Sequence, residues 1–417
     1  MSGLTNRRTA VMVAAVMAII GVGFSTTSAG AALHSASVLG TKDPAKGTPV
    51  KIGVVSNGTT ETLGTSPEPE VSEATVKWLN DYQGGIAGHP IELKVCTDGG
   101  QQAKAVDCAN QMIADKVAAV AIGSDGLSST IWGILHDAGI PVFLYGAPDP
   151  KITADATSTF VMGNSRSALL GLPVAVAKKE KAKTVSVVVI DVPAATAFYT
   201  SPTGAQMFKD AGIGLDMIPV AAGTADMTPQ MQKLTSTNPN GVVFVLGNDS
   251  FCIAAFNGLR TAGFKGTITT LPACISDATR TAVPADFLKG MQISASSPLG
   301  DPKDPSMKQF AAVLKKYGAA DVNLDESGPA AMFEVLGAMN VATKGLKGEV
   351  TPQSIIAATK AMPWSVLPGT GGLHFRCNGK ADPDQPAVCS SATLAATLNS
   401  EGNATKYTPV GDTEIPA

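Results

Sequence analysis

The sequence KIGVVS at residues 51–56 is the first of four short apolar runs, and it is followed by IELKVC at 91–96, VAAVAIG at 117–123 and IPVFLY at 140–145. Segments of helical length separate these runs, at 71–82, 101–115 and 129–137. Strands that alternate with helices are typical of βαβ units, in which helices cover both faces of a parallel sheet. We therefore predict an α/β fold that begins with one doubly wound, flavodoxin-like lobe.

The same alternation starts again further along the chain. The second set of apolar runs is TVSVVVID at 184–191, LDMIPV at 215–220, GVVFVLG at 241–247, TITTL at 267–271 and MQISAS at 291–296. The helical segments of this set are 201–210, 228–236 and 251–262. The repeat predicts a second doubly wound lobe.

Three further helices are expected at 306–317, 329–344 and 352–361, with no strong strand between them. Because these helices need a sheet to cover, we expect the chain to return to the first lobe and then to cross back from Gly371. This predicts three hinge crossings. Lobe 1 would comprise 49–163 and 297–370, and lobe 2 would comprise 164–296 and 371–417.

The first residues have the order of a secretory signal. Arg7 and Arg8 precede an apolar run over 10–24, and Ala29-Gly30-Ala31 supplies a small-residue cleavage site. We predict a signal peptide over 1–31, by the general or the twin-arginine route, and a flexible leader over 32–48. The apolar run is too short to span a bilayer. Since no cysteine precedes Cys96, no lipid anchor is expected, and the protein should be free in the periplasm or cell envelope.

The six cysteines agree with export, because disulfides persist outside the cytosol. They fall in three local pairs, which are Cys96 with Cys108, Cys252 with Cys274, and Cys377 with Cys389. Fifteen pairings are formally possible, and the nearest-neighbour pairing is the one we predict. A zinc site is the alternative, but CxxC spacing and nearby histidines are missing.

Composition and motifs exclude several function classes. The chain of 417 residues has 31 basic and 34 acidic residues, so no basic surface for nucleic acid is expected. The sequence contains no G-x-S-x-G, H-E-x-x-H or Walker motif, and no strand followed by G-x-G-x-x-G. We expect no catalysis, no metal and no cofactor.

Ligands of doubly wound sheets bind outside the carboxyl ends of the strands. The loops expected there are poor in charge and rich in glycine, hydroxyls and backbone amides. They are Asn57–Pro69, Gly123–Thr130, Gly146–Pro150, Asp191–Ser201, Asn248–Phe251 and Pro272–Ser276. Such a lining favours a small solute held by helix N-termini and backbone groups.

Two of these loops carry the main candidates. The loop before the helix at 129–137 offers amides and hydroxyls for an anionic ligand group; the alternative is that Ser128 or Ser129 only caps that helix. Asn248 and Asp249 follow the strand at 241–247, where Asp249 could accept a hydrogen bond from a ligand or cap the next helix, or both.

Aromatic residues near these loops could contribute to a ligand site. Tyr199, exposed in a crevice loop, could stack on a ligand, while core packing is expected for Phe198. Core burial is also expected for Trp132, which lies on the helix beside the serine loop.

The order of motifs resembles the extracytoplasmic solute-binding proteins of branched-chain-amino-acid-type ABC importers, which have the type I periplasmic binding fold. The resemblance runs from Pro49 to the C-terminus. It rests on VKIGVVS, LNDYQGGIAGHPIELKV, AVDCANQMIADKVAAVAIG, SSTIWGILHDAGIPVF and, late in the chain, GGLHFRCNGK. In the last stretch Arg376 and Lys380 stand where acidic residues are usual.

The resemblance implies a monomer whose lobes close on an amino acid, amide or related solute and deliver it to a membrane permease. It implies that a ligand carboxylate meets Leu127, Ser128, Gly146 and Ala147, and that Tyr199, Asn248 and Asp249 close over the ligand from lobe 2. Ala273 stands where amino-acid binders have an acidic residue for the α-amino group. A carboxylate without an α-amine, an amide or a larger apolar acid is therefore as well supported as leucine.

The resemblance leaves two other roles open. The first is a sensory component with the same fold, which would signal occupancy to a membrane partner. The second is an exported hydrolase that uses His136 or His374.

Overall fold

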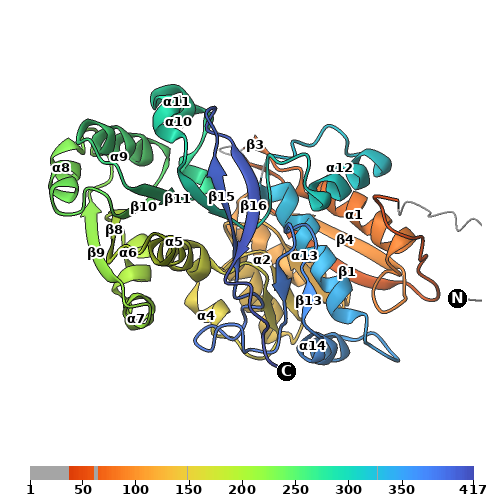
Figure 1. Ribbon diagram of the computed structural model, residues 1–417. Helices are drawn as coiled ribbons and strands as arrows, with labels where there is room; N and C mark the ends of the chain where they lie inside the picture. The colour runs from red at the N-terminus through yellow and green to blue at the C-terminus, as the bar shows by residue number, and fades with distance from the viewer. Residues whose placement is uncertain (1–36, 61–63, 148, 326) are drawn as a thin grey trace, which may run out of the picture. The chain divides into compact units, whose positions relative to one another are not determined.

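The computed structural model describes residues 37–60, 64–147, 149–325 and 327–417. The signal peptide expected over 1–31 lies outside the described residues. The rest of the chain is built on two separate sheets, to which we refer, with their helices, as lobe 1 and lobe 2 (Figure 1).

Lobe 1 contains a five-stranded parallel sheet in the order β4-β1-β5-β6-β7. Its strands are β1 (Val50–Ser56), β4 (Ile91–Thr97), β5 (Ala119–Ile122), β6 (Val142–Leu144) and β7 (Thr159–Val161), and its connecting helices are α1 (Glu68–Tyr82), α2 (Gln102–Ala114), α3 (Ser128–Asp137) and α4 (Pro150–Thr153). The four expected strands are confirmed. The fifth, β7, was not predicted, because three residues carry too little pattern to stand out.

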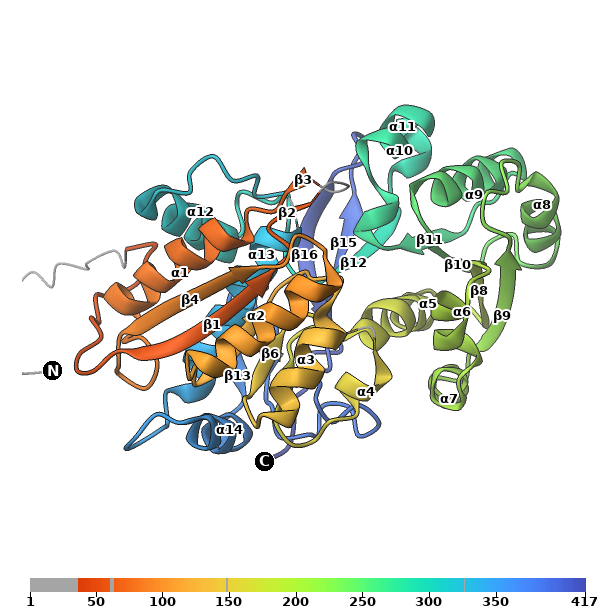
Figure 2. The ribbon, with the colours of Figure 1, turned by 180° about the vertical axis from the view of Figure 1, so that it is seen from behind.

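Alternating side chains give this sheet two cores. Ile52 and Val54 pack with α1 and with three later helices, whereas Val55 packs with α2 and α3 on the opposite face (Figure 2). The later helices are α12 (Pro305–Tyr317), α13 (Ser327–Thr343) and α14 (Pro352–Ala361). The expected return of this part of the chain to the first sheet is therefore correct.

Lobe 2 contains a seven-stranded sheet in the order β16-β15-β12-β11-β10-β8-β9. Its parallel strands are β8 (Thr184–Ile190), β9 (Gly214–Val220), β10 (Val242–Leu246), β11 (Thr267–Thr270) and β12 (Gln292–Ala295). Two antiparallel strands, β15 (Thr393–Leu398) and β16 (Ala404–Val410), extend one edge. The sequence did not predict this hairpin, because its Ala- and Thr-rich strands lack the strong apolar signal of the others.

The helices of lobe 2 cover both faces of its sheet. They are α5 (Leu172–Glu180), α6 (Pro193–Thr200), α7 (Pro202–Asp210), α8 (Thr228–Thr237), α9 (Asp249–Thr261), α10 (Asp277–Ala282) and α11 (Ala285–Leu288), with a π-helical turn η1 (Ser167–Gly171) and a 3-10 turn η2 (Pro272–Cys274). Two-stranded ribbons pair β2 (Thr59–Thr60) with β3 (Gly64–Thr65) and β13 (Ser365–Val366) with β14 (His374–Phe375).

The expected flexible leader is bound to lobe 1 from residue 37 onward. The indole Nε1 of Trp78 donates to the carbonyl of Leu39 at 2.9 Å, and the amide of Ala45 donates to the carbonyl of Asn80 at 2.7 Å. These contacts give the leader residues fixed partners on and beside α1. The flexibility expected for the leader over 32–48 stays a prediction.

The third crossing lies later than Gly371. Phe375, Cys377 and Cys389 are buried in the lobe 1 core with α1 and α13, and Val388 forms a bridge with Val161 of β7. The chain therefore covers lobe 1 through residue 389 and joins the second sheet only at β15. A short apolar segment such as HF at 374–375 fits either sheet, so the sequence alone placed it in the wrong lobe.

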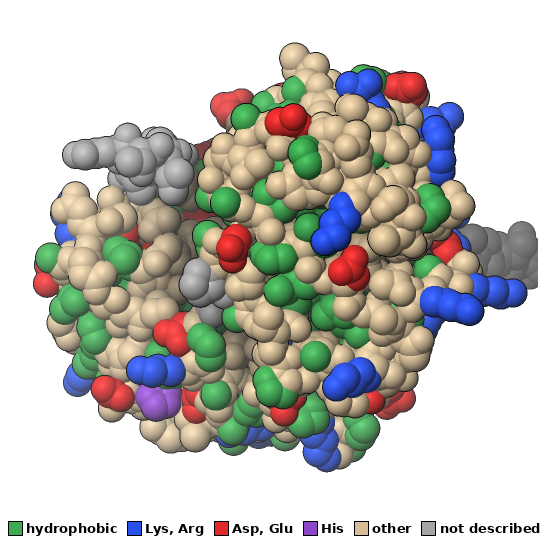
Figure 3. All heavy atoms as spheres, turned by 90° about the vertical axis from the view of Figure 1, so that its left-hand side faces the viewer, with side chains coloured by type: hydrophobic (Ala, Val, Ile, Leu, Met, Phe, Trp, Pro, Cys, Tyr) green, Lys and Arg blue, Asp and Glu red, His purple; other side chains and the backbone are tan. Residues whose placement is uncertain are grey.

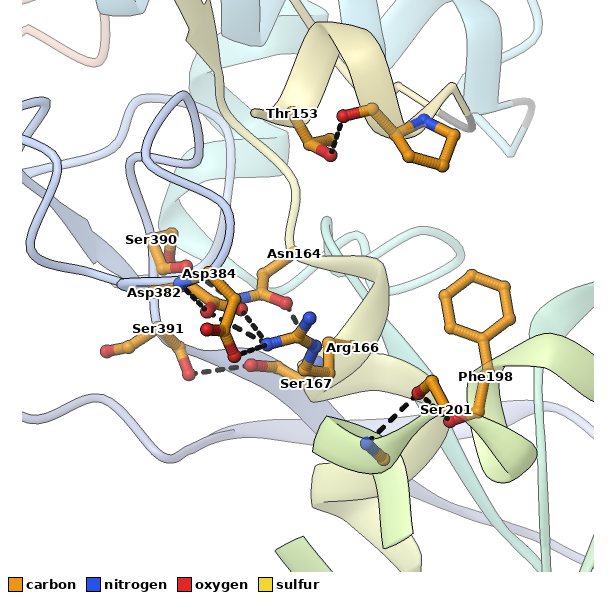
Figure 4. Close-up of polar contacts among 12 residues, drawn as sticks. Thr153, Asn164, Arg166, Ser167, Phe198, Ser201, Asp382, Asp384, Ser390 and Ser391 are labelled. Atoms are coloured by element: carbon orange, nitrogen blue, oxygen red, sulfur yellow. Dashed lines mark hydrogen bonds and ion pairs between the residues drawn. The ribbon is translucent and has the colours of Figure 1, made fainter. Parts of the chain in front are cut away.

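Hydrogen bonds join the crossing segments to one another (Figure 4). The Asn164 Nδ2 donates to the carbonyl of Ser390 at 2.9 Å, and the Ser167 hydroxyl donates to the carbonyl of Ser391 at 2.7 Å. The Ser294 hydroxyl at the end of β12 donates to the carbonyl of Ala168 at 3.0 Å. All three passages between the lobes are thus linked by side-chain bonds.

An ion pair reinforces the first and third crossings. Arg166 Nη1 lies 2.9 Å from Asp382 Oδ2 and 3.4 Å from Asp384 Oδ2 (Figure 4). The side chains of Arg166 and Asp382 are 15% and 9% exposed, so water screens this pair only weakly. The Cys377–Cys389 disulfide closes the loop that carries both aspartates.

We expect Asp382→Asn to lower the free energy of unfolding by about 2 kcal/mol, because it leaves a largely buried guanidinium short of its main partner. Urea unfolding monitored by circular dichroism measures the change. The matched control is Asp277→Asn, which breaks the pair of Arg280 with a fully exposed carboxylate and should cost less than about 0.5 kcal/mol. Equal losses in the two variants would contradict the prediction.

Candidate functional site

The carboxyl ends of the lobe 1 strands meet at one edge, which we call the lobe 1 edge and define by the loops that follow β1, β4, β5 and β6. The parallel register pairs Ser56 with Thr97 and Ile122 with Leu144. The loops also bond to each other, since the amide of Gly99 donates to the carbonyl of Asn57 at 2.9 Å. Groups from four separate stretches of sequence are therefore neighbours here.

A carboxyl group is buried at the centre of this edge. Glu68, the first residue of α1, is 0% exposed. Its Oε2 accepts a hydrogen bond from the Ser56 hydroxyl at 2.7 Å, and its Oε1 accepts one from the amide of Ser124 at 2.6 Å. Burial raises the pKa of Glu68 to about 7, although both hydrogen bonds oppose that shift.

Gly123 leaves the space for this carboxyl. A Cβ at Gly123 would lie 2.2 Å from Glu68 Oε1, well inside any real contact distance. The residue that follows β5 must therefore lack a side chain if α1 is to place its first carboxyl between β1 and β5.

A second pair of carboxyls lies on the same edge. Asp98 follows β4 and is 0% exposed, and Asp125 lies in the loop after β5. One oxygen of each is bound, because the amide of Gly100 donates to Asp98 Oδ1 and that of Leu127 donates to Asp125 Oδ1, both at 2.7 Å. Burial, with the neighbouring Asp98, raises the pKa of Asp125 to about 6.

A further buried acid lies beneath the second crossing. Glu334 on α13 is 0% exposed, and its Oε2 accepts a hydrogen bond from the Ser297 hydroxyl at 3.4 Å. Burial raises the pKa of Glu334 well above its ordinary value, and the hydrogen bond from Ser297 opposes that shift. Burial and Glu334 together also raise the pKa of Tyr145, which follows β6.

The predicted residues of lobe 1 fall on this edge. Leu127 precedes α3, and Ser128 and Ser129 begin it; Ser128 is buried, whereas Ser129 is exposed. Neither serine caps the helix, because the N-cap position is Leu127 and no side chain bonds there. Gly146 and Ala147 follow the neighbouring strand β6 and are half-buried.

The predicted residues of lobe 2 lie on two neighbouring loops. Asn248 is the N-cap of α9, and its Oδ1 accepts a hydrogen bond from the amide of Phe251 at 3.1 Å, so the cap is Asn248 and not Asp249. Asp249 is half-buried in the first turn, and Ala273 is exposed in η2. The Cys252–Cys274 disulfide links these two loops, with the Cα atoms 5.4 Å apart.

Tyr199 is not available to a ligand in this structure. Residues 193–200 form helix α6 where a loop was expected, and this turns the Tyr199 ring into the lobe 2 core at 2% exposure. Its hydroxyl donates to the carbonyl of Leu169 at 3.2 Å. Phe198, for which core packing was expected, is the half-buried member of the pair. The two predictions are wrong because helical periodicity, and not the loop position, sets which ring points inward.

All six cysteines form the three nearest-neighbour bridges. Besides Cys252–Cys274 and Cys377–Cys389, Cys96 of β4 is joined to Cys108 of α2. Trp132 is half-buried, and its Nε1 donates to the Thr159 hydroxyl at 2.8 Å.

His136 and His374, the two candidate residues for a hydrolase, are each paired with groups that do not form a catalytic arrangement with a serine or cysteine nucleophile in the described contacts. His374 Nδ1 lies 2.8 Å from Asp412 Oδ2, and the Trp364 ring stacks on its imidazole. The nearby Ser390 hydroxyl donates to the backbone carbonyl of His374, not to the ring. His136 Nε2 lies 3.4 Å from the Thr157 hydroxyl and 3.6 Å from Asp155 Oδ1.

The described residues also bear on metal binding and on membrane insertion. No cluster of three or more His, Cys, Asp or Glu residues in 37–60, 64–147, 149–325 and 327–417 is arranged to hold a metal ion. In the same ranges, no helix has the length and apolarity needed to cross a membrane.

A sequence model of the family described as periplasmic binding protein matches residues 49–388. The chain belongs to the periplasmic binding protein family. Its two lobes form the type I periplasmic binding fold, which the resemblance in the sequence had indicated. A comparison with curated proteins finds no match.

Solved structures share the fold of this periplasmic binding protein. A putative branched-chain amino acid ABC transporter protein from Rhodospirillum rubrum has a TM-score of 0.67 at 16% identity, covering 86% of this chain and 99% of that one. The substrate-binding protein LivJ of Streptococcus pneumoniae, solved with isoleucine, has a TM-score of 0.61 at 17% identity and covers 87% and 99%. A solute-binding protein from R. palustris, solved with 4-hydroxybenzoate, has a TM-score of 0.60 at 18% identity and covers 88% and 98%.

Sequence reasoning missed Glu68, Asp98 and Glu334 in this binding protein. Asp98 directly follows a clear strand and precedes two glycines, so its place at a strand end was visible in the sequence. Glu68 and Glu334 lie on helices, where acidic residues are common at the surface, and no local pattern shows that they are buried.

We predict that Glu68 makes folding pH-dependent between about pH 4.5 and 7. Its folded pKa is above the ordinary value, so the native state binds the proton more tightly, and that stabilisation is lost as the pH rises through 7. Relative to Glu68→Gln, the wild type should lose on the order of 3 kcal/mol across this window. Urea unfolding of both proteins at pH 4.5, 6 and 8 measures the difference, and parallel pH profiles would refute the assignment.

Gly123→Ala should destabilise the protein by about 2 kcal/mol, because the new methyl group displaces the Glu68 carboxyl from its donors. The control is Gly126→Ala in the same loop, where an added Cβ meets no atom within 4 Å and should change stability by less than about 0.5 kcal/mol. Thermal unfolding compares the two variants, and similar midpoints would contradict the prediction.

Proposed function

We propose that the protein is an extracytoplasmic solute-binding protein that captures a small solute between the lobe 1 edge and the matching edge of lobe 2. The observation that carries the proposal is a pair of sheets, each with a run of five parallel strands and polar loops at their carboxyl ends, in one chain that crosses three times between them. Ligand sites of doubly wound sheets form outside such edges.

The exposed part of the lobe 1 edge supplies groups suited to a small polar ligand. Ser124 and Ser129 are exposed beside the buried acids, and Gly146 has open space where a side chain would stand. On lobe 2, Asn248, Asp249 and Ala273 occupy loops held together by a disulfide. A solute that contacts both sets would favour the closed arrangement over the open one, because only closure makes both sets of contacts.

The linked crossings support such a closing motion. The bond between Asn164 and Ser390 joins two segments that lie outside the strands of both sheets, so the lobes can pivot there without disturbing either sheet. Hinges are commonly a few residues at element ends that absorb the change in backbone angles.

Delivery to the membrane permease of an ABC importer is the role that the family supports best. The transporter proteins with isoleucine and 4-hydroxybenzoate show that this fold binds amino acids and aromatic acids. Export is supported by the order of the first residues and by the three disulfides. As a receptor, the protein would return its solute unchanged and act as a monomer.

The test is a thermal-shift screen of the oxidised protein, starting at Ala32, against amino acids, their deaminated acids, amides and amines. A solute at 100 times its dissociation constant should add about 2.7 kcal/mol of stability. Gly146→Leu should then weaken binding at least ~10-fold by filling the site. Gly133→Leu, at a glycine of α3 that also has open space, should bind like the wild type. Chemical conversion of the solute, or equal affinities in both variants, would contradict the proposal.

A further inference from the structure

We infer that the solute presents a positively charged or N–H-rich group, and not a carboxylate, to the lobe 1 edge; this inference rests on the proposed function and names the chemical class of its ligand. The charge that a ligand carboxylate would bring is already supplied there by the protein's own acids. Oxygen atoms of neighbouring side chains, Asn57 on lobe 1 and Asp249 on lobe 2, lack donors.

The amides expected to hold a ligand carboxylate are already occupied. The Ser124 amide donates to Glu68 Oε1, the Leu127 amide donates to Asp125 Oδ1, and the Ser128 amide donates to the Asp125 carbonyl. The Asp125 carboxylate therefore lies at the N-terminus of α3, in the position where the helix dipole would stabilise a bound anion. The expectation from the sequence that this loop binds an anion is replaced by the opposite one.

Asp98 and Asp125 are hydrogen-bonded to each other through their side chains, so a shared proton joins these two carboxyls. Two other buried oxygens at the edges accept no hydrogen bond from any described residue. They are Asn57 Oδ1 on lobe 1 and Asp249 Oδ1 on lobe 2. An unsatisfied buried acceptor is costly, and a ligand ammonium, amidinium or amide group would supply donors to these atoms.

In the described parts of the chain, no Lys, Arg or His forms an ion pair with Glu68, Asp98, Asp125 or Asp249. The loops after β1, β4, β5, β6, β8, β10 and β11 contain no Lys or Arg in the sequence. Arg280 on α10 lies beside the last of them, in a cavity of about 600 Å³, and its Nη1 is 2.9 Å from Asp277. On the face shown in Figure 3, basic and acidic side chains are interspersed.

The titration of the acids agrees with this geometry. Glu68 faces Ser56, Ser124 and Asp125, and Asp125 faces Asp98, so each acid has acidic or neutral neighbours. A cation placed beside them would favour their ionised forms and displace protons. The affinity for a cationic ligand should therefore rise with pH between about 5 and 8.

Planar probes that differ only in charge test the inference. Benzamidinium, benzamide and benzoate, and their smaller counterparts acetamidinium, acetamide and acetate, are titrated into the oxidised protein by ligand-observed NMR and calorimetry. In each series the amidinium should bind at least ~10-fold more tightly than the carboxylate at pH 8, with the amide between them. The amidinium affinity should fall several-fold at pH 5.

The variant Asp125→Asn should reduce amidinium affinity by ~10-fold or more, leave carboxylate affinity unchanged or higher, and flatten the pH dependence. Asp137→Asn is the control, because it removes the same charge from an exposed residue at the other end of α3 and should leave all affinities unchanged. Glu68→Gln is a second test variant with the same expected direction, and thermal unfolding verifies that each variant is folded.

Three outcomes overturn the inference. They are tighter binding of the carboxylate, an unchanged preference in both Asp125→Asn and Glu68→Gln, and no binding of either amidinium. The thermal-shift screen of the proposed function separates the two claims. A carboxylate solute whose binding is weakened by Gly146→Leu would refute the inference but leave the proposed function standing. Chemical conversion of the solute would refute the proposed function itself.

Discussion

The buried carboxyl of Glu68 is the group on which the lobe 1 edge depends. A carboxyl removed from water without a cation must find hydrogen-bond donors or stay neutral. Here the donors come from Ser56 at the end of β1 and from the Ser124 amide after β5, so one side chain connects α1 with two strands. The arrangement requires glycine at residue 123, because a Cβ there would collide with the Glu68 carboxyl.

The crossings show a second constraint, because a chain that passes three times between two lobes must satisfy the backbone groups it exposes there. Asn164 and Ser167 bond to carbonyls at Ser390 and Ser391, and the Arg166 pair with Asp382 adds charge to the same junction. The disulfide-closed loop that carries Asp382 packs on lobe 1, so the third passage between lobes is short.

The kind of ligand that the lobe 1 edge favours depends on which side chains the fold brings together there. In the sequence, the loop after β5 offers hydroxyls, amides and a helix N-terminus, which are the features of an anion site. In the structure, amides of that loop already donate hydrogen bonds to the carboxylates of Glu68 and Asp125. Asp98, which follows a different strand, is buried at the same edge. The loop that the sequence predicted to bind an anion is therefore, in the structure, rich in hydrogen-bond acceptors.

The sequence by itself determined the α/β class, nine of the strands, the return of the late helices to lobe 1 and the three cysteine pairs. These depend on local periodicity, turn residues and short separations along the chain, all of which can be read from neighbouring residues. Only the tertiary structure decided that Glu68, Asp98 and Glu334 are buried and that residues 374–389 pack on lobe 1. These outcomes depend on which distant segments become neighbours, and no local pattern contains that information.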